Sequence, residues 1–152
     1  TFAKALRVAA LSVIVAVAGA AAAHANKPPV SVELLQPAAA GGYDVTSYFT
    51  GSPVRGSAQF TATHNGATYR FASAANRDKF VANPAAFAPQ YGGYCAWAVS
   101  QGYTAPGRPQ FWKVVDGKLY LNYSAEVQQR WERDIPGFIQ SANRNWPGVL
   151  AK

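Results

Sequence analysis

Short stretches of alternating apolar and polar residues mark two β-hairpins in this chain of 152 residues. A dipeptide that favours a tight two-residue turn joins each pair of stretches, Asn65-Gly66 in the first and Asp116-Gly117 in the second. In the first hairpin, Tyr69 and Phe71 fall on one face because side chains alternate along a strand. The predicted strands are residues 57–63 and 67–72 in the first hairpin and residues 111–115 and 118–123 in the second.

Capping residues and helix breakers place the helices around these hairpins. Ser73 and Ser124 are good N-caps, whereas Gly102 and Pro147 end helices. In the helix after Ser73, Phe80 and Val81 are expected to face the core. Two hairpins packed with short helices predict one small α+β domain, and we find no internal repeat in the sequence. The helices are expected over residues 74–82 with a further turn to Phe87, over 94–101, over 125–134 and over 136–146.

An apolar run near the N-terminus predicts export. Lys4 and Arg7 precede residues 8–23, which are apolar or small except Ser12, and Ala23-His24-Ala25 then fits a signal peptidase site. A cleaved signal peptide over residues 1–25 and an uncleaved anchor that crosses the membrane with residues 6–23 both fit this layout. In either case we expect the domain in the periplasm, soluble or anchored to the inner membrane.

The segment after the apolar run reads as a linker. In residues 26–42, Lys27-Pro28-Pro29 resists helix and the stretch from Ala38 to Gly42 is rich in Ala and Gly. Between them, residues 30–35 are a candidate edge strand. We therefore expect a linker over 26–42 and the globular domain over 43–149.

Charge and composition exclude several classes of function. The chain has a net charge of +7, and the scattered Lys and Arg residues form no stripe for nucleic acid. There is one cysteine, Cys95, and no methionine, so an internal disulfide is excluded and soft metal ligands are few. The serines that cap helices lie in no nucleophile elbow, and we find no phosphate loop or Rossmann fingerprint. Enzymatic activity is therefore not the favoured reading.

The hairpin-to-helix segment resembles a known family. Gly66, Tyr69, Phe71 and Ser73, followed by residues 80–87 (FVANPAAF), resemble the YHS domain. The likeness extends to the exported YHS-domain proteins over about residues 41–148. Its further matching segments are residues 42–45 (GYDV), 91–96 (YGGYCA), 111–122 (FWKVVDGKLYLN), 134–137 (DIPG) and 145–147 (NWP).

The resemblance implies a YHS-like fold and a role in metal handling, because YHS domains accompany copper-transport ATPases. Many of them carry a C-S-x-x-C pair, and here those two places hold Ala72 and Asn76. Some exported relatives are described as selenoproteins, which implies that the place of Cys95 is used chemically in them. Copper is therefore the cofactor to test, through Cys95.

Two residue types carry the candidate chemistry. Cys95 follows Gly92-Gly93 near the predicted start of a helix, where thiolate is favoured. His64 is a second candidate metal ligand, although its place at a hairpin tip favours an exposed turn residue. A metal site usually takes three or four ligands, so a Cys95–His64 pair needs a second copy or a partner. The aromatic residues form either core or a binding face, and the candidates for that face are Tyr91, Tyr94, Trp97, Tyr103 and Trp112.

Three functions compete on this basis. The first is a non-enzymatic binding protein of the cell envelope that handles metal through Cys95. The second is an accessory subunit that docks on an inner-membrane protein complex through a retained N-terminal helix. The third is a thiol redox protein that uses Cys95.

Overall fold

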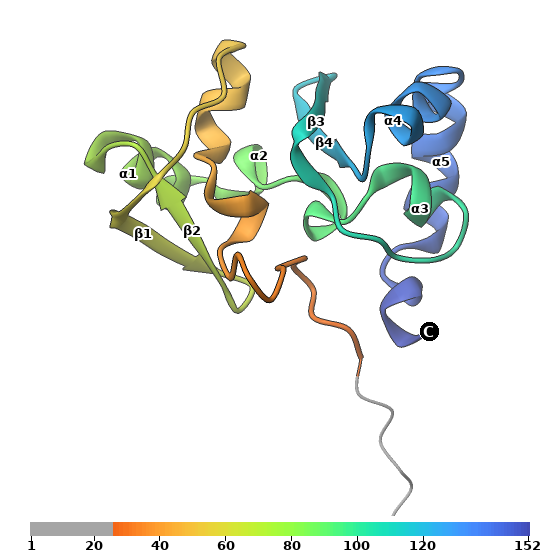
Figure 1. Cartoon of the computed structure of the whole chain (residues 1–152), viewed down its shortest axis with the longest axis horizontal. Coiled ribbons are helices and arrows are strands. Elements are labelled where there is room, and N and C mark those ends of the chain that lie inside the picture. Colours follow the sequence, from red (N-terminus) through yellow and green to blue (C-terminus); the bar gives the residue numbers. More distant parts are fainter. Residues whose placement is uncertain (1–25) are drawn as a thin grey trace, which may run out of the picture.

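Two β-hairpins stand side by side, each with helices packed against it (Figure 1). The computed structural model describes residues 26–152. Each hairpin is a separate two-stranded antiparallel sheet. The predicted α+β domain of two hairpins and short helices is confirmed. The strands are β1 (Ser57–His64), β2 (Ala67–Phe71), β3 (Arg108–Val115) and β4 (Lys118–Asn122); the α-helices are α1 (Ala74–Ala82), α2 (Pro84–Phe87), α3 (Ala96–Ser100), α4 (Ala125–Glu132) and α5 (Ile135–Asn145); the 3-10 helices are η1 (Ala39–Gly42), η2 (Val45–Thr50), η3 (Gln90–Gly93) and η4 (Gly148–Ala151).

The turns and caps form as the local sequence dictates. Asn65 and Asp116 have φ of 50° and 51°, and the glycine after each also has positive φ, which is the geometry of a tight hairpin turn. Ser73 Oγ accepts from Asn76 N–H (3.1 Å) to begin α1, and Ser124 Oγ accepts from Val127 N–H (3.2 Å) to begin α4. These interactions involve residues close in sequence, which is why the sequence predicts them well.

Two predicted elements and one predicted core residue differ from the structure. The helix expected over 94–101 is only α3, because Tyr94 is extended and Cys95 N–H donates to Ala105 O (2.8 Å). The strand expected over 30–35 is absent; its residues form a tight turn with a single pairing, between Glu33 and Gln36. Val81 is 58 % exposed, since Phe80 takes the core-facing position of α1.

The segment expected as a flexible linker packs on the domain. Val30 and Ala38–Ala40 are buried. Ser31 N–H donates to Gly92 O (2.8 Å), and Tyr94 OH donates to Pro28 O (2.9 Å). Residues 27–42 are therefore part of the folded unit, because their backbone bonds to the second half of the chain while Val30, Ala39 and Ala40 pack in the hydrophobic cluster of the first half.

An internal repeat is present, contrary to the expectation from the sequence. The bounds of β1 and β2 shifted by 51 residues, the difference between Ser57 and Arg108, give the bounds of β3 and β4. The same shift takes η1 to η3 and the first residue of α1 to that of α4. Both hairpins also carry a register irregularity at the matching place, between Ser57 and Thr61 and between Arg108 and Trp112.

The backbone before each hairpin repeats in detail. Ala40, Gly41 and Gly42 have φ of 52°, 60° and 79°, and Tyr91, Gly92 and Gly93 have φ of 58°, 61° and 81°. Few residues are identical between the halves, and the matches fall mainly at turns and caps, which explains why the repeat escapes a reading of the sequence.

Strand β4 lies between two hydrophobic clusters. Leu119 and Leu121 pack into the cluster of the first half, around Phe71, Tyr69 and Phe80. Tyr120, on the other face of the strand, packs into the second cluster, around Trp131. Both faces of β4 are therefore buried, so the two repeats share one interior.

The predicted signal peptide or anchor, residues 1–25, and its N-terminal hydrophobic helix lie outside the described residues. From Asn26 to Lys152, no helix has the length and apolar character needed to cross a membrane.

Candidate functional site: the Cys95 pocket

Cys95 lies between the Gly92-Gly93 bend and α3, where main-chain hydrogen bonds hold it on both sides. Its N–H donates to Ala105 O (2.8 Å), and its carbonyl accepts from Val99 N–H (3.0 Å). The residue is 1 % exposed. The sequence thus correctly places Cys95 at the start of a helix, but its position depends on the distant loop at Ala105.

The thiol of Cys95 is surrounded by hydrogen-bonding groups. Its Sγ–H donates to Asn122 Oδ1 (3.5 Å). Burial raises the pKa of the Cys95 thiol, while hydrogen bonds from the backbone N–H groups of Ala98, Tyr123 and Trp97 act in the opposite direction. Because burial dominates, the resting group is a protonated thiol, with backbone donors in place to stabilise negative charge on sulfur.

In the first half of the chain, the equivalent backbone N–H groups bind a carboxylate. Shifted by 51 residues, Cys95 corresponds to Asp44, a fully buried carboxylate in the first half. Asp44 Oδ1 accepts from Thr46 N–H (3.0 Å), and Asp44 Oδ2 accepts from Ala72 N–H (2.9 Å). Thr46 and Ala72 correspond to Trp97 and Tyr123. The equivalent N–H groups of the second half lie beside the Cys95 thiol, although the Trp97 N–H donates to Asn122 Oδ1 there (3.1 Å).

A pocket of about 190 Å³ opens beside Cys95. Trp97 and Tyr103 pack edge to face within it, with ring centroids 6.3 Å apart. Tyr103 is 46 % exposed and Tyr123 is 40 % exposed, so the pocket reaches solvent between them. The pocket is therefore mainly aromatic and apolar. Its lining residues are Cys95, Trp97, Ala98, Tyr103, Ala105, Tyr123 and Val127.

A difference between the repeats accounts for this pocket. In the first half, Asn76 Nδ2 donates to Asp44 Oδ2 (2.8 Å) and so covers the carboxylate. The corresponding residue in the second half is Val127. Its apolar side chain makes no such hydrogen bond and lines the pocket instead. The space that Asn76 closes around Asp44 is thus left open around Cys95.

Asn122 is a buried polar residue in this site that the sequence does not reveal. Its Oδ1 accepts from Trp97 N–H (3.1 Å) as well as from Cys95 Sγ, which fixes the orientation of the amide. Its Nδ2 has no hydrogen-bond partner among the described residues, although the residue is fully buried. The corresponding residue in the first half is Phe71. A signal was present in the sequence, since a polar residue at an inward strand position requires a partner.

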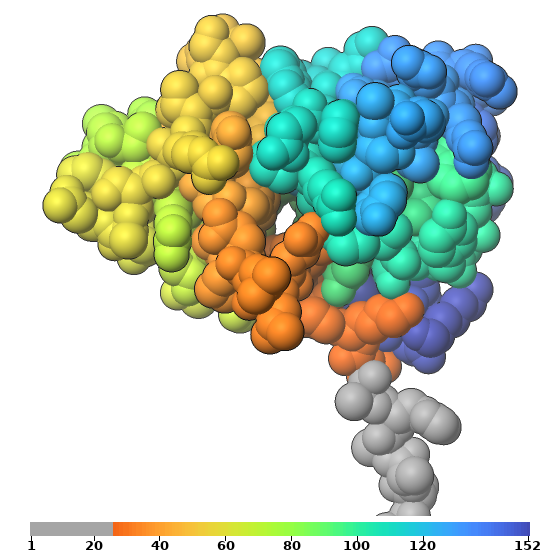
Figure 2. All heavy atoms as spheres, viewed as in Figure 1, coloured from red at the N-terminus to blue at the C-terminus, as the bar shows by residue number. Residues whose placement is uncertain are grey.

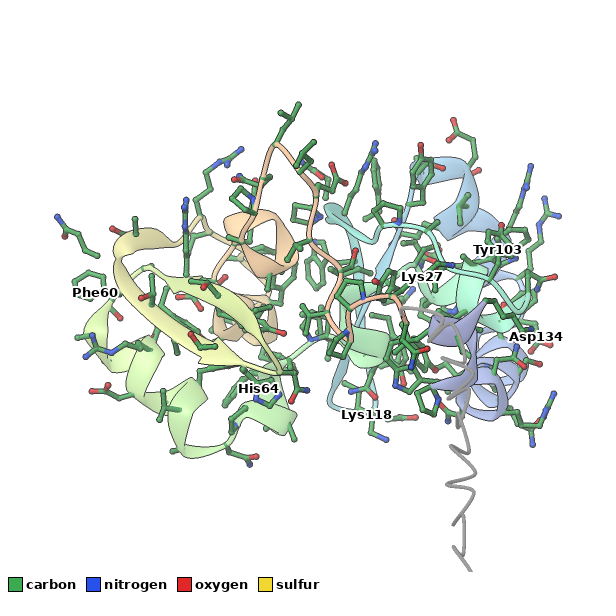
Figure 3. The ribbon with its side chains drawn as sticks, turned by 90° about the horizontal axis from the view of Figure 1, so that it is seen from below. Lys27, Phe60, His64, Tyr103, Lys118 and Asp134 are labelled. Atoms are coloured by element: carbon green, nitrogen blue, oxygen red, sulfur yellow. The ribbon has the colours of Figure 1, made fainter. Side chains whose placement is uncertain are left out.

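His64 lies away from the pocket. Its ring packs edge to face on Phe80 (5.8 Å between centroids) and tilts against Tyr69 (6.2 Å). Figure 3 shows His64 on the first half of the molecule and Tyr103, which lines the pocket, at the far side of the second half. The structure therefore does not bring His64 and Cys95 together within one chain, and the histidine is a half-buried packing residue at the end of β1.

The five aromatic residues expected as a binding face separate into three places. Trp97 and Tyr103 lie at the Cys95 pocket. Tyr91 and Tyr94 are buried in the second cluster, where Tyr91 OH donates to Asn143 Oδ1 (2.8 Å). Trp112 packs edge to face on Tyr48, with centroids 5.2 Å apart, in the first cluster. Only Trp97 and Tyr103 are placed to contact a ligand.

The donor groups in residues 26–152 do not form a metal centre. No three His, Cys, Asp or Glu side chains gather in this part of the chain. Cys95 is the one thiol of the protein and its immediate side-chain neighbour is the Asn122 amide oxygen, which is a hard donor. The residues present therefore do not fit a closed copper site.

Compared with protein-family models, with curated proteins and with solved structures, the chain gives no match.

Proposed function

We propose that this chain is a non-catalytic binding protein of the cell envelope, with a YHS-like domain, and that its ligand site is the Cys95 pocket. The observation that carries the proposal is a single thiol, held by backbone donors, next to an apolar pocket that reaches solvent. Because the sequence predicts an export signal before the domain, we propose the periplasm as the compartment in which it acts.

The lining of the pocket supports binding more than catalysis. Apart from Cys95 and two tyrosines, the residues that line it carry no acid or base. The rings of Trp97, Tyr103 and Tyr123 favour an apolar or aromatic group. Arg130 lies over the Trp97 ring, 5.6 Å from its centroid, and adds a positive charge near one side. The proposed ligand thus combines an apolar group with an anionic or thiol-seeking group.

Copper handling through Cys95 receives less support from this donor set. Metal analysis of purified protein with and without the Cys95→Ser substitution tests it directly. Copper that is retained by the wild-type chain and lost from the variant would favour a metal role with a donor from a second copy or a partner.

The Val127→Asn substitution tests the proposed pocket. It restores the residue that covers Asp44 in the first half, so it should fill the space beside Cys95. We expect an apolar fluorescent dye, anilinonaphthalene sulfonate, to bind the wild-type protein and to bind Val127→Asn about tenfold more weakly, since the change removes apolar contacts worth about 1–2 kcal/mol. The matched control is Val81→Asn on exposed α1, which should leave dye binding unchanged. Equal dye binding by Val127→Asn and the wild type would contradict the proposal.

Thiol redox chemistry is a second candidate, favoured by the three backbone N–H groups around Sγ. In this reaction hydrogen peroxide transfers one oxygen atom to Sγ, sulfenic acid forms and water leaves. Backbone donors that correspond to those on the Asp44 carboxylate would stabilise the sulfenate. Sulfenate trapping after peroxide treatment should then label Cys95 in the native protein. Labelling only after unfolding in urea would exclude this function.

Docking on an inner-membrane protein complex through a retained helix stays a proposal that depends on residues 1–25. Mass spectrometry of the native N-terminus tests it, because a chain that begins at Asn26 has lost the helix.

A further inference from the structure

We infer that the turn from Glu33 to Gln36, together with the polar hollow beside it, is a contact site for an anionic phospholipid surface. The residues that line it differ from those of the Cys95 pocket, and the two places meet only where Arg108 stacks on Tyr123. It is built from the N-terminal segment and the start of β3.

The turn displays two leucines. Leu34 and Leu35 are each 95 % exposed, and Val32 before them is 42 % exposed. Large apolar side chains next to each other are normally buried, because removing them from water is favourable. A protruding apolar pair therefore calls for a partner that covers it.

The base of the turn is held in place. Gln36 N–H donates to Glu33 O (3.0 Å), which closes the turn. Gln36 Nε2 donates to Gly41 O (3.0 Å), and Arg108 Nε donates to Glu33 Oε1 (3.4 Å). The leucines are thus presented by a fixed turn, so little further ordering is needed when they are buried by a partner.

A hollow of about 180 Å³ lies beside this turn, and Figure 2 shows the surface hollowed here between the orange N-terminal segment and teal β3. Arg55 comes from the first half and Arg108 from the second, and both line it. Each guanidinium is stacked on a tyrosine ring, Arg55 on Tyr43 (5.2 Å) and Arg108 on Tyr123 (4.6 Å). Stacking leaves the N–H edge of a guanidinium available to donate hydrogen bonds to a phosphate. Glu33 is the only acidic residue in the lining, so two positive charges face one negative charge.

These features together favour a bilayer over other partners. A phosphodiester headgroup matches the paired arginines, and the acyl region next to it matches the protruding leucines. A free phosphate would leave the leucines in water. A folded protein would need an apolar hole and an acidic group at matching positions. The described residues also carry an excess of positive charge, with 12 Lys and Arg against 7 Asp and Glu once Lys4 and Arg7 are set aside.

A fluorophore at the turn tests the inference. In a Cys95→Ser background, Leu35→Cys is labelled with an environment-sensitive nitrobenzoxadiazole dye, and the full chain is mixed with vesicles. Vesicles with phosphatidylglycerol should shift the emission to the blue and protect it from a water-soluble quencher. The control label at Val81→Cys, on exposed α1, should show neither change. Because the readout is local, attachment of residues 1–25 to the vesicle does not by itself produce it.

Charge variants test the arginines. Arg55→Ala with Arg108→Ala should weaken the response at position 35 by about tenfold or more, because each basic residue near an anionic surface contributes about 1 kcal/mol. Lys118→Ala with Arg144→Ala removes the same charge elsewhere and should change it much less. An equal response with phosphatidylcholine vesicles, or with inorganic phosphate alone, would overturn the inference. A blue shift that grows with protein concentration without vesicles would also overturn it, and would identify a second copy as the partner.

Discussion

Cys95 occupies in the second repeat the place that Asp44 occupies in the first, facing equivalent backbone N–H groups. The first repeat uses this place for structure, since Asp44 joins η2, the end of β2 and α1 through its two carboxylate oxygens. In the second repeat, the same place is taken by Cys95, which lines a pocket that reaches solvent. A duplicated framework has thus kept a stabilising carboxylate in one copy and a solvent-linked thiol in the other.

Asp44→Ala should destabilise the fold strongly. The substitution leaves four hydrogen-bond donors, from Thr46, Ala72 and Asn76, without their acceptor in a buried place. Unpaired buried groups cost about 1–3 kcal/mol each, so we expect a loss of about 3–5 kcal/mol in the free energy of unfolding, measured in urea. Asp78→Ala, on the exposed face of α1, is the control and should change stability by less than about 0.5 kcal/mol. Similar stabilities of the two variants would argue against the role given to Asp44.

Gly92→Ala should also be costly, for two reasons. Gly92 has φ of +61°, and an added Cβ would overlap the carbonyl group of Pro29 in the N-terminal segment. Gly117 has a similar φ of +73° but open space around it, so Gly117→Ala isolates the cost of the backbone conformation. We expect about 1 kcal/mol for Gly117→Ala and at least about 2 kcal/mol more for Gly92→Ala, from thermal or urea unfolding. Equal losses would mean that residues 27–31 do not pack on the bend.

Alkaline pH should unfold the protein through its buried tyrosines. Burial raises the pKa of Tyr69 to about 12 from 10.0. The native state keeps this proton while the unfolded state loses it, so its contribution is complete below about pH 10 and is lost as pH rises to about 12. The loss is about 1.4 kcal/mol per pH unit in that window. Tyr69→Phe should reduce the pH dependence of the unfolding free energy by this amount, and an unchanged dependence would contradict the assignment.

Alkylation should report the burial of Cys95. The thiol is 1 % exposed and burial raises its pKa, so the native protein should react with iodoacetamide at least about tenfold more slowly than the protein in urea. Val127→Ala enlarges the pocket and should speed the native reaction. If Val127→Ala reacts as slowly as the wild type, the pocket does not provide the route to Sγ.

The elements set by neighbouring residues could be predicted from the sequence, and those set by distant contacts could not. The two hairpins follow from Asn65-Gly66 and Asp116-Gly117, and the caps from Ser73 and Ser124. In contrast, α3 is shorter than expected because the loop at Ala105 holds Cys95 in an extended connection. Residues 26–42 look like a linker by composition, yet their backbone bonds to Gly92 and their alanines fill the first cluster.

The sequence indicated three of the residues at the candidate site but not Asn122 or Val127. Cys95, Trp97 and Tyr103 do meet at a pocket, whereas Tyr91, Tyr94 and Trp112 serve the core. The roles of Asn122 and Val127 become clear only when the two repeats are aligned, so that they correspond to Phe71 and Asn76. Which aromatic rings face a pocket and which face the interior depends on tertiary packing that a single sequence does not contain.

The shared strand β4 couples the unfolding of the two repeats. Because Leu119 and Leu121 complete one cluster and Tyr120 completes the other, neither repeat has a finished interior without the same five-residue strand. Fraying of β4 would expose both clusters at once. We therefore expect the two repeats to unfold together in a single transition, and a chain cut between them to yield two fragments that do not fold separately.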